Sequence, residues 1–299
     1  MESVDSALAT PALTLPTELE REIFEILALS SPKFIPTLLL VAQRVKIWTE
    51  PLLYRTLSVV AKGTELKSVP NAIRISPEDC LELVNREPVF FHDHVRYLAF
   101  KNLSQDDAFL ILSHCHRLAH LAVFSMYPVP SWLPLLAAMP LLEFSANVDR
   151  LFDFLEADFR HPLFTSVTHL DLFEVPAAEG WVEALCSLSH LTHLSFNYDE
   201  RHFPRIPFHR ILVSNKSLQV LVLIFMTDDV IDIEDFSFPE RKYFTQDPRS
   251  VIMVVDRFLD DWEIGTVGGE NYWIRAERFI EKRRSGEVPA SQYYLAVAS

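Results

Sequence analysis

Six short segments in the middle of the chain share one apolar pattern and recur at nearly constant spacing. Each segment has the frame apolar-x-x-apolar-x-apolar. The central apolar residues of the six are Leu98, Leu121, Phe144, Leu170, Leu194 and Leu221. Subtracting successive numbers gives spacings of 23, 23, 26, 24 and 27 residues. Such a period predicts supersecondary units that bury their apolar faces only by stacking on their neighbours.

The stretches between these segments are typical of helices. They comprise residues 104–115, 132–139, 149–159 and 180–188. Strand and helix alternating at this period predict an α/β solenoid, with parallel strands on its concave side and helices on its convex side. A conventional parallel α/β sheet is the alternative. Six in-frame repeats at near-constant spacing favour the solenoid.

Side chains alternate across a strand, so the frame residues are predicted to face the core and the intervening residues to face the concave side. Phe124 and Phe173 are expected there as exposed aromatic anchors with a mixed polar rim, the composition of a protein-binding patch. The last row, Val220, Val222 and Ile224, is wholly apolar and is expected to lie under the C-terminal segment. The candidate target-binding residues are Tyr97, Lys101, His120, Phe124, Glu143, His169, Asp171, Phe173, His193 and Asn197.

The stretch from Leu15 to Leu57 predicts short helices placed ahead of the repeats. Thr17 and Glu20 have the spacing of a capping box. The first helix carries an apolar face formed by Leu19, Ile23, Ile26 and Leu27. Ser30, Ser31 and Pro32 should end this helix, a second helix should open near Pro36, and Pro51 should interrupt it.

About 45 residues in three short helices cannot bury all of these apolar side chains among themselves. Two interpretations follow from the pattern alone. The helices are a docking module for another protein, or they are the terminal cap that a repeat array needs.

Two resemblances bear on this choice. The N-terminal stretch resembles an F-box in its divergent F-box-like form, through Leu15-Pro16, Glu18-Leu19, Ile23, Leu27, Pro36, Leu39 to Val41, Arg44, Trp48 and Pro51-Leu52-Leu53-Tyr54. The family usually has Val-Cys-x-x-Trp in its middle helix, whereas here Val41-Ala42-Gln43-Arg44 is followed by Val45, and Trp48 comes three residues late. Residues 54–225 resemble leucine-rich repeats, although only Asn147 and Asn197 occupy the family's asparagine position.

Together these resemblances imply a substrate-recognition subunit of an SCF-type ubiquitin ligase. In that family the F-box binds a Skp-type adaptor, which attaches to the cullin, and the repeats hold the protein to be ubiquitinated. No chemistry occurs on the receptor itself. The residues that the resemblance assigns to adaptor binding are Leu15, Pro16, Leu19, Ile23 and Leu27, with Leu39 and Leu40 behind them.

Two other classes of function stay open. One is a leucine-rich-repeat scaffold without ligase function, suggested by the displaced Trp48. The other is an enzyme, which ranks last because the sequence contains no G-x-S-x-G, Walker A or H-E-x-x-H motif. The histidines at 114, 116 and 120 lack a second ligand pair at a recognisable offset, so neither a metal nor a cofactor is expected.

Composition narrows the class of partner. The net charge of −14 disfavours binding to nucleic acids and to anionic membranes. Three widely spaced cysteines imply no disulfide framework, which fits a reducing compartment, cytoplasmic or nuclear. The expected organisation is a disordered tail at 1–12, the helical module at 13–57, the solenoid at 58–245, and a capping strand and helix with a tail at 246–299.

Overall fold

The computed structural model describes residues 15–64, 69, 72–153, 157–177, 180–198, 206–226 and 240–295. The tail expected to be disordered, 1–12, lies outside these residues. The chain divides into two compact units, Met1–Leu52 and Leu53–Ser299. Each unit is described by itself below.

The first unit is helical within its described residues. Its elements are α1 (Thr17–Ser30), the 3₁₀-helix η1 (Pro32–Phe34), α2 (Ile35–Leu38) and α3 (Gln43–Leu53), whose last residue belongs to the second unit. Their small shared core consists of Ala28, Ile35, Leu38 and Val45, all nearly or fully buried. So few buried residues confirm that these helices have more apolar surface than they can cover themselves.

Three local predictions for this unit are wrong. Thr17 does not cap α1, because it is already helical and Pro16 occupies the cap position without a side-chain hydrogen bond. Glu20 accepts two hydrogen bonds from Arg44 on α3 instead of closing a capping box. Pro51 lies inside α3 and does not interrupt it. Its missing N–H removes one hydrogen bond of the helix, which ends two residues later at Leu53.

The second unit is built on a parallel sheet of ten strands within its described residues, in the order β10-β9-β8-β7-β6-β5-β4-β3-β1-β2. The strands are β1 (Thr56–Val60), β2 (Arg74–Ile75), β3 (Tyr97–Lys101), β4 (His120–Phe124), β5 (Glu143–Ala146), β6 (His169–Leu172), β7 (His193–Asn197), β8 (Val220–Met226), β9 (Ser250–Val255) and β10 (Tyr294–Leu295). Consecutive strands lie side by side except at the β2 edge, as a stacked strand–helix repeat requires.

Strand register follows the predicted frame. Leu98 pairs with Leu121, Leu121 with Phe144, and the pairing continues through Leu170 and Leu194 to Leu221. All six central residues are fully buried. The apolar frame therefore sets both the pairing and the face of each strand, because a slip of one residue would turn every side chain over.

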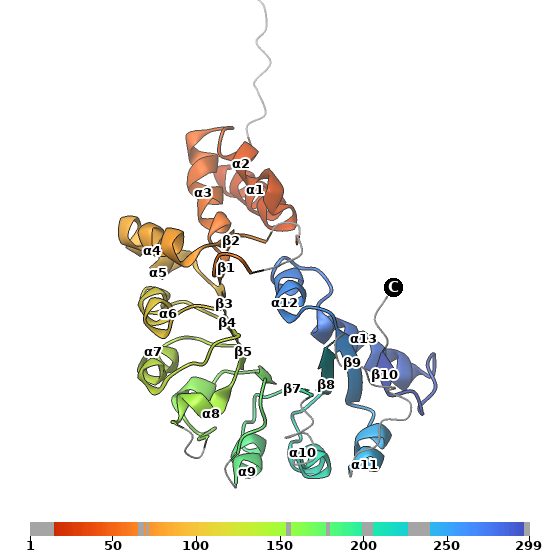
Figure 1. The fold of residues 1–299 in the computed structure, drawn as a ribbon. Helices are drawn as coiled ribbons and strands as arrows, with labels where there is room; N and C mark the ends of the chain where they lie inside the picture. The colour runs from red at the N-terminus through yellow and green to blue at the C-terminus, as the bar shows by residue number, and fades with distance from the viewer. Residues whose placement is uncertain are drawn as a thin grey trace, which may run out of the picture. The chain divides into compact units, whose positions relative to one another are not determined.

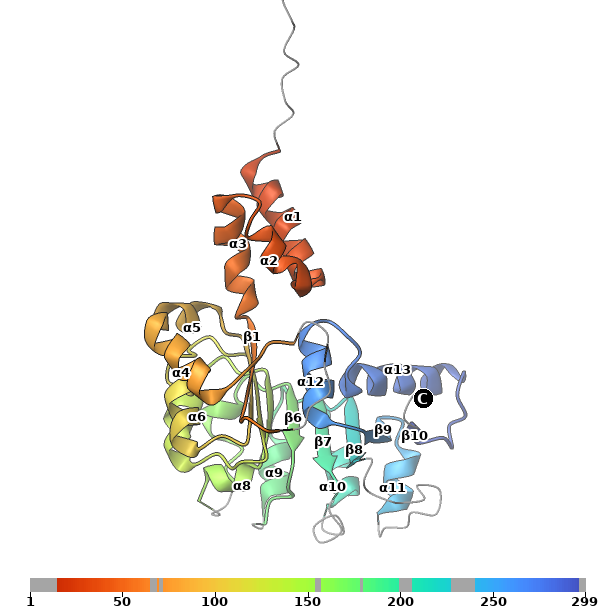
Figure 2. The ribbon, with the colours of Figure 1, turned by 45° about the horizontal axis from the view of Figure 1, so that its top comes forward.

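Helices cover both faces of the sheet. Figure 1 shows one series along its outer side and the labelled helices α12 and α13 on its inner side, and Figure 2 shows the sheet between them. The outer series is α4 (Pro77–Arg86), α5 (Pro88–His94), α6 (Gln105–Leu112), η2 (Pro130–Trp132), α7 (Leu133–Ala137), α8 (Val148–Leu151), η3 (Pro162–Phe164), α9 (Trp181–Cys186), α10 (Phe208–Ser214) and α11 (Arg241–Gln246). The inner helices are α12 (Phe258–Thr266) and α13 (Tyr272–Ser285). The fold class is therefore α/β, a parallel sheet flanked by helices in a solenoid-like arrangement.

The two faces form two separate hydrophobic cores. The outer core holds the six frame residues together with side chains of α4 to α11. The inner core joins concave-side residues of β3, β4, β8 and β9 to α12 and α13. The predicted cover over Val220, Val222 and Ile224 is confirmed, because all three belong to this inner core.

The C-terminal segment does more than the predicted capping of the array's end. The predicted strand is β9, which extends the sheet beyond β8. The predicted helix is α13, and it lies on the concave side and reaches β5 through Trp273 and β7 through Tyr272. Its large aromatic side chains pack there against the apolar and polar rows of the sheet that the outer helices do not cover.

Arg283 fixes the end of α13 and yields a stability prediction. Its buried guanidinium donates to the carbonyl oxygens of Gln292, Asp247, Pro248 and Ser250 at 2.6 to 3.2 Å. Arg283→Met should lower the free energy of unfolding by ~2–4 kcal/mol, because several buried acceptors lose their donor. Urea unfolding measures this, with Arg284→Met, an exposed neighbour, as the matched control. Equal stability of the two variants would contradict the anchoring role.

Candidate functional site

The first candidate site is the apolar surface of the helical unit. The side chains of Leu19, Ile23 and Leu27 lie along α1 and are 47%, 52% and 40% exposed. Leu15 and Pro16 precede the helix and are also exposed, Leu40 is 86% exposed, and Leu39 is half-buried. Sequence reasoning did not assign Val41 or Ile47 to this surface, although both are more than half exposed.

One ion pair holds the two longer helices of this unit together. The Arg44 guanidinium donates from Nε to Glu20 Oε2 at 2.9 Å and from its terminal nitrogen to Oε1 at 2.6 Å. These hydrogen bonds lower the pKa of Glu20 and raise that of Arg44. This two-point contact links α1 to α3 at the surface of the unit.

The second candidate site is the concave side of the sheet. The structure places the ten predicted residues there in register, from Tyr97 opposite His120 to His193 opposite Val220. None of the ten is exposed: Phe124, Glu143, Asp171 and His193 are buried, and the others are half-buried. The chain's own helices α12 and α13 contact several of them, among them Phe124, Glu143 and His193.

The expectation that Phe124 and Phe173 are exposed anchors is therefore wrong. Their rings stack at 5.4 Å between centroids, and both rings contact Phe258 of α12. They are internal packing residues, because Phe258 of α12, which is 85 residues after Phe173 and 134 after Phe124, packs against both. No local sequence pattern reports such a long-range contact.

Glu143 is the centre of the polar rows beneath α13. Its carboxylate lies 2.7 Å from Nδ1 of His120 and accepts a hydrogen bond of 3.3 Å from the Trp273 indole. Burial opposes its ionisation, yet the hydrogen bonds and nearby histidine charge leave the pKa of Glu143 below its usual value. Glu143 is therefore a buried carboxylate at neutral pH.

Two histidines stack beside it. The rings of His169 and His193 are 4.0 Å apart and nearly parallel, and the Trp273 ring stands almost perpendicular to both. Burial lowers the pKa of each histidine to about 4, so both are neutral at pH 7. Nε2 of His193 lies 3.0 Å from the carboxylate of Glu277 on α13.

A pocket of about 180 Å³ opens at the N-terminal ends of the strands that carry these residues. Its sheet side is formed by Tyr97, His120, Glu143 and His169. The other side comes from α12, α13 and the turn between them: Trp262, Gly265, Thr266, Asn271, Trp273, Ile274 and Glu277. Sequence reasoning missed this second wall, although Trp273 and Glu277 are four residues apart and so share one face of α13.

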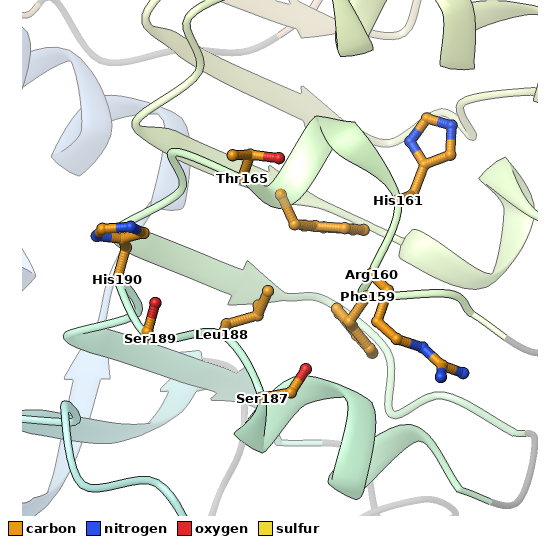
Figure 3. A pocket seen from close by; sticks show the side chains of 9 residues that line it. Phe159, Arg160, His161, Thr165, Ser187, Leu188, Ser189 and His190 are labelled. Carbon is orange, nitrogen blue, oxygen red and sulfur yellow. The ribbon is translucent and has the colours of Figure 1, made fainter.

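A larger pocket of about 320 Å³ lies between residues 159–165 and 187–190 (Figure 3). Arg160, His161 and His190 line it, a composition that could suit an anion. Figure 3 shows these three side chains well apart and not pointing at one centre. Arg160 also pairs with Asp158 at 3.4 Å, and His161 Nδ1 accepts the backbone N–H of Leu163. These partners make the larger pocket the weaker candidate.

The described part of the chain contains no cluster of three or more His, Cys, Asp or Glu side chains suited to a metal ion. Nor does any helix in that part have the length and apolar character to cross a membrane. Comparison with known protein families finds no match, and comparison with curated proteins finds none either.

Asp171 gives a pH prediction for the concave side. It is fully buried and accepts a hydrogen bond of 2.5 Å from Ser195 Oγ. Burial raises its pKa to about 8, aided by the charge of Glu143. An unfolded aspartate ionises near pH 4 (~3.9). The folded state therefore binds the extra proton between about pH 4 and 8, and stability should fall as pH rises through that window.

Asp171→Asn removes this titration. The unfolding free energy of the variant minus that of the wild type should grow with pH from 5 to 8, by up to ~1.4 kcal/mol per pH unit. Urea unfolding at several pH values measures the difference. Asp106→Asn, an exposed aspartate on α6, is the matched control. A difference that stays constant with pH would show that Asp171 ionises normally.

Proposed function

We propose that this protein is the substrate-recognition subunit of an SCF-type ubiquitin ligase. In this proposal the helical unit is an F-box-like module that binds a Skp-type adaptor and, through it, the cullin complex. The second unit is a leucine-rich-repeat solenoid that recognises a target protein. The observation that carries the proposal is the row of exposed apolar side chains along α1, described above.

The energetics favour a partner for this row. Complete burial of a large aliphatic side chain contributes ~1.5–3 kcal/mol, and roughly half-exposed side chains gain part of that. The exposed aliphatic residues of the unit can therefore contribute several kcal/mol to association. Five of them belong to the predicted adaptor surface: Leu15, Leu19, Ile23, Leu27 and Leu40. The small core of the unit leaves this surface uncovered, and a row this continuous is unusual for a surface with no binding role.

We assign the proposed contact to α1, because two pattern residues on α3 are engaged within the unit. Trp48 is half-buried, and Arg44 is engaged by Glu20. The adaptor would then meet chiefly Leu15, Leu19, Ile23 and Leu27, with Leu40 at the margin. The Glu20–Arg44 pair would hold α1 in position for that contact.

The proposed target contact differs from the open concave face that leucine-rich repeats suggest. Helices α12 and α13 cover much of that face, and an open pocket lies between them and the strand starts. We therefore assign target recognition to this pocket and its rim, which include Tyr97, His120, Glu143 and His169.

A scaffold without ligase function is the second candidate, and the late position of Trp48 favours it. Such a scaffold would use the same exposed row on α1 for a different partner and would not associate with the adaptor. Adaptor binding therefore separates the two functions directly.

Replacing both Ile23 and Leu27 with Asp should reduce capture of a purified Skp-type adaptor by at least tenfold. Two buried charges would stand at the centre of the proposed apolar contact, and burying an unpaired charge is strongly unfavourable. A pull-down with purified full-length protein, quantified against adaptor concentration, gives the measurement.

The matched control is the double variant Phe109→Asp and Leu110→Asp. Both residues are exposed on α6 of the second unit, at 38% and 43%, so this variant should capture the adaptor normally. Undiminished capture by the Ile23 and Leu27 variant would rule out the assigned surface. Absence of adaptor capture by the wild type would favour the scaffold.

A further inference from the structure

The pocket between the sheet and α13 is lined by hydrogen-bond acceptors whose partners in the wall are histidine and tryptophan rings. None of its lining residues is Lys or Arg, whereas two carboxylates, Glu143 and Glu277, contribute to the wall. Glu143 has one hydrogen-bond partner on each oxygen, and a carboxylate oxygen can accept two. Within the described chain, Glu277 forms no ion pair with Lys or Arg, and its carboxylate lies 3.0 Å from Nε2 of His193.

The tautomer of His169 adds a further acceptor. The Thr168 hydroxyl donates its only hydrogen to the Leu142 carbonyl at 3.1 Å. It lies 2.9 Å from Nδ1 of His169, so we assign the imidazole proton to Nδ1. The neutral ring then leaves Nε2 as an acceptor. Within the described residues, no side chain or backbone group donates to that nitrogen.

Cations near this wall already have partners. Arg275 pairs with Asp261 at 2.5 Å, and Arg74 pairs with Asp260 and Glu263 on α12. Arg55 lies over the Tyr97 ring, 5.5 Å from its centroid. These pairs leave the carboxylates of Glu143 and Glu277 as the charges that face the pocket.

Two tryptophans complete the lining. Trp273 and Trp262 are each 3% exposed and contribute aromatic surface, which attracts cations as well as alkyl groups. The indole N–H of Trp262 is buried and lacks a hydrogen-bond partner in the part of the chain that the structure describes. The indole N–H is enclosed, so the two tryptophans offer the pocket their ring surfaces.

We propose that this pocket binds the side-chain ammonium of a lysine in a target polypeptide. An ammonium has three donors and no acceptor, which suits the carboxylates of Glu143 and Glu277 and the Nε2 of His169. The four-carbon stem would lie against Trp262 and Trp273. The pocket volume of about 180 Å³ is several times the ~30 Å³ that one water occupies in the liquid, so the stem and head group fit.

This inference deepens the proposed function, because it names the chemistry that the target would present. The site itself depends only on the second unit, so it can be tested without the adaptor.

Isothermal titration of the full-length protein with acetyl-Gly-Lys-Gly-amide tests the site. The matched ligand is the same peptide with norleucine, which keeps the stem and lacks the ammonium; n-butylammonium chloride keeps the ammonium and lacks the peptide. The lysine peptide should bind at least tenfold more tightly than the norleucine peptide and severalfold more tightly than butylammonium. Butylammonium binding as tightly as the lysine peptide would identify a free-amine site and overturn the polypeptide assignment.

Glu277→Gln should weaken lysine-peptide binding at least fivefold. Glu277 is exposed on α13, so the substitution should leave the fold intact. Glu281→Gln, one turn further along the same exposed surface, is the control and should bind normally. Equal affinity of the two variants, equal affinity for lysine and norleucine peptides, or no measurable binding of the lysine peptide would overturn the proposal.

Adaptor capture by the same proteins keeps the two proposals separate. Glu277→Gln should capture the adaptor normally, and the Ile23 and Leu27 double variant should bind the lysine peptide normally. Peptide binding without adaptor capture would leave the pocket assignment intact and remove the ligase function. Adaptor capture without peptide binding would do the reverse.

Discussion

Burial of both faces of one parallel sheet is the constraint on which the second unit depends. Parallel strands need cover on each face, and the repeats supply helices only on the outer one. Helices α12 and α13 supply the other cover, with Trp262, Tyr272 and Trp273 packed against the concave rows. The carbonyl contacts of Arg283 then attach the end of α13 to the turn before β9.

The same cover determines the chemistry of the concave rows. On an open sheet, the polar residues of the concave rows would be in contact with water and would have ordinary pKa values. Under α13 the pKa values of His169 and His193 fall, whereas that of Asp171 rises. Glu143 keeps its charge because His120 and Trp273 bind it. The protonation state of each residue therefore depends both on its burial and on its hydrogen-bond partner.

The two proposed binding surfaces differ in physical character. On α1 an apolar row lies exposed on a unit too small to cover it, which favours a hydrophobic partner. At the strand starts, α13 leaves a small opening lined by acceptors and aromatic rings, which favours a cation. An adaptor contact and a lysine contact can therefore coexist in one chain, because they draw on different residues and different interactions.

The apolar frame by itself determined the six central strands, their register and their buried face. Its central residues repeat every 23 to 27 positions, and the alternation of side chains leaves only one face for the core. The exposed face of α1 could also be predicted from helical periodicity. Only the tertiary structure decided that Phe124 and Phe173 are internal and that a pocket forms beside Glu143. Those outcomes depend on where α12 and α13 pack. Contacts between segments so far apart in sequence depend on all the surfaces that compete for burial, so no local sequence pattern encodes them.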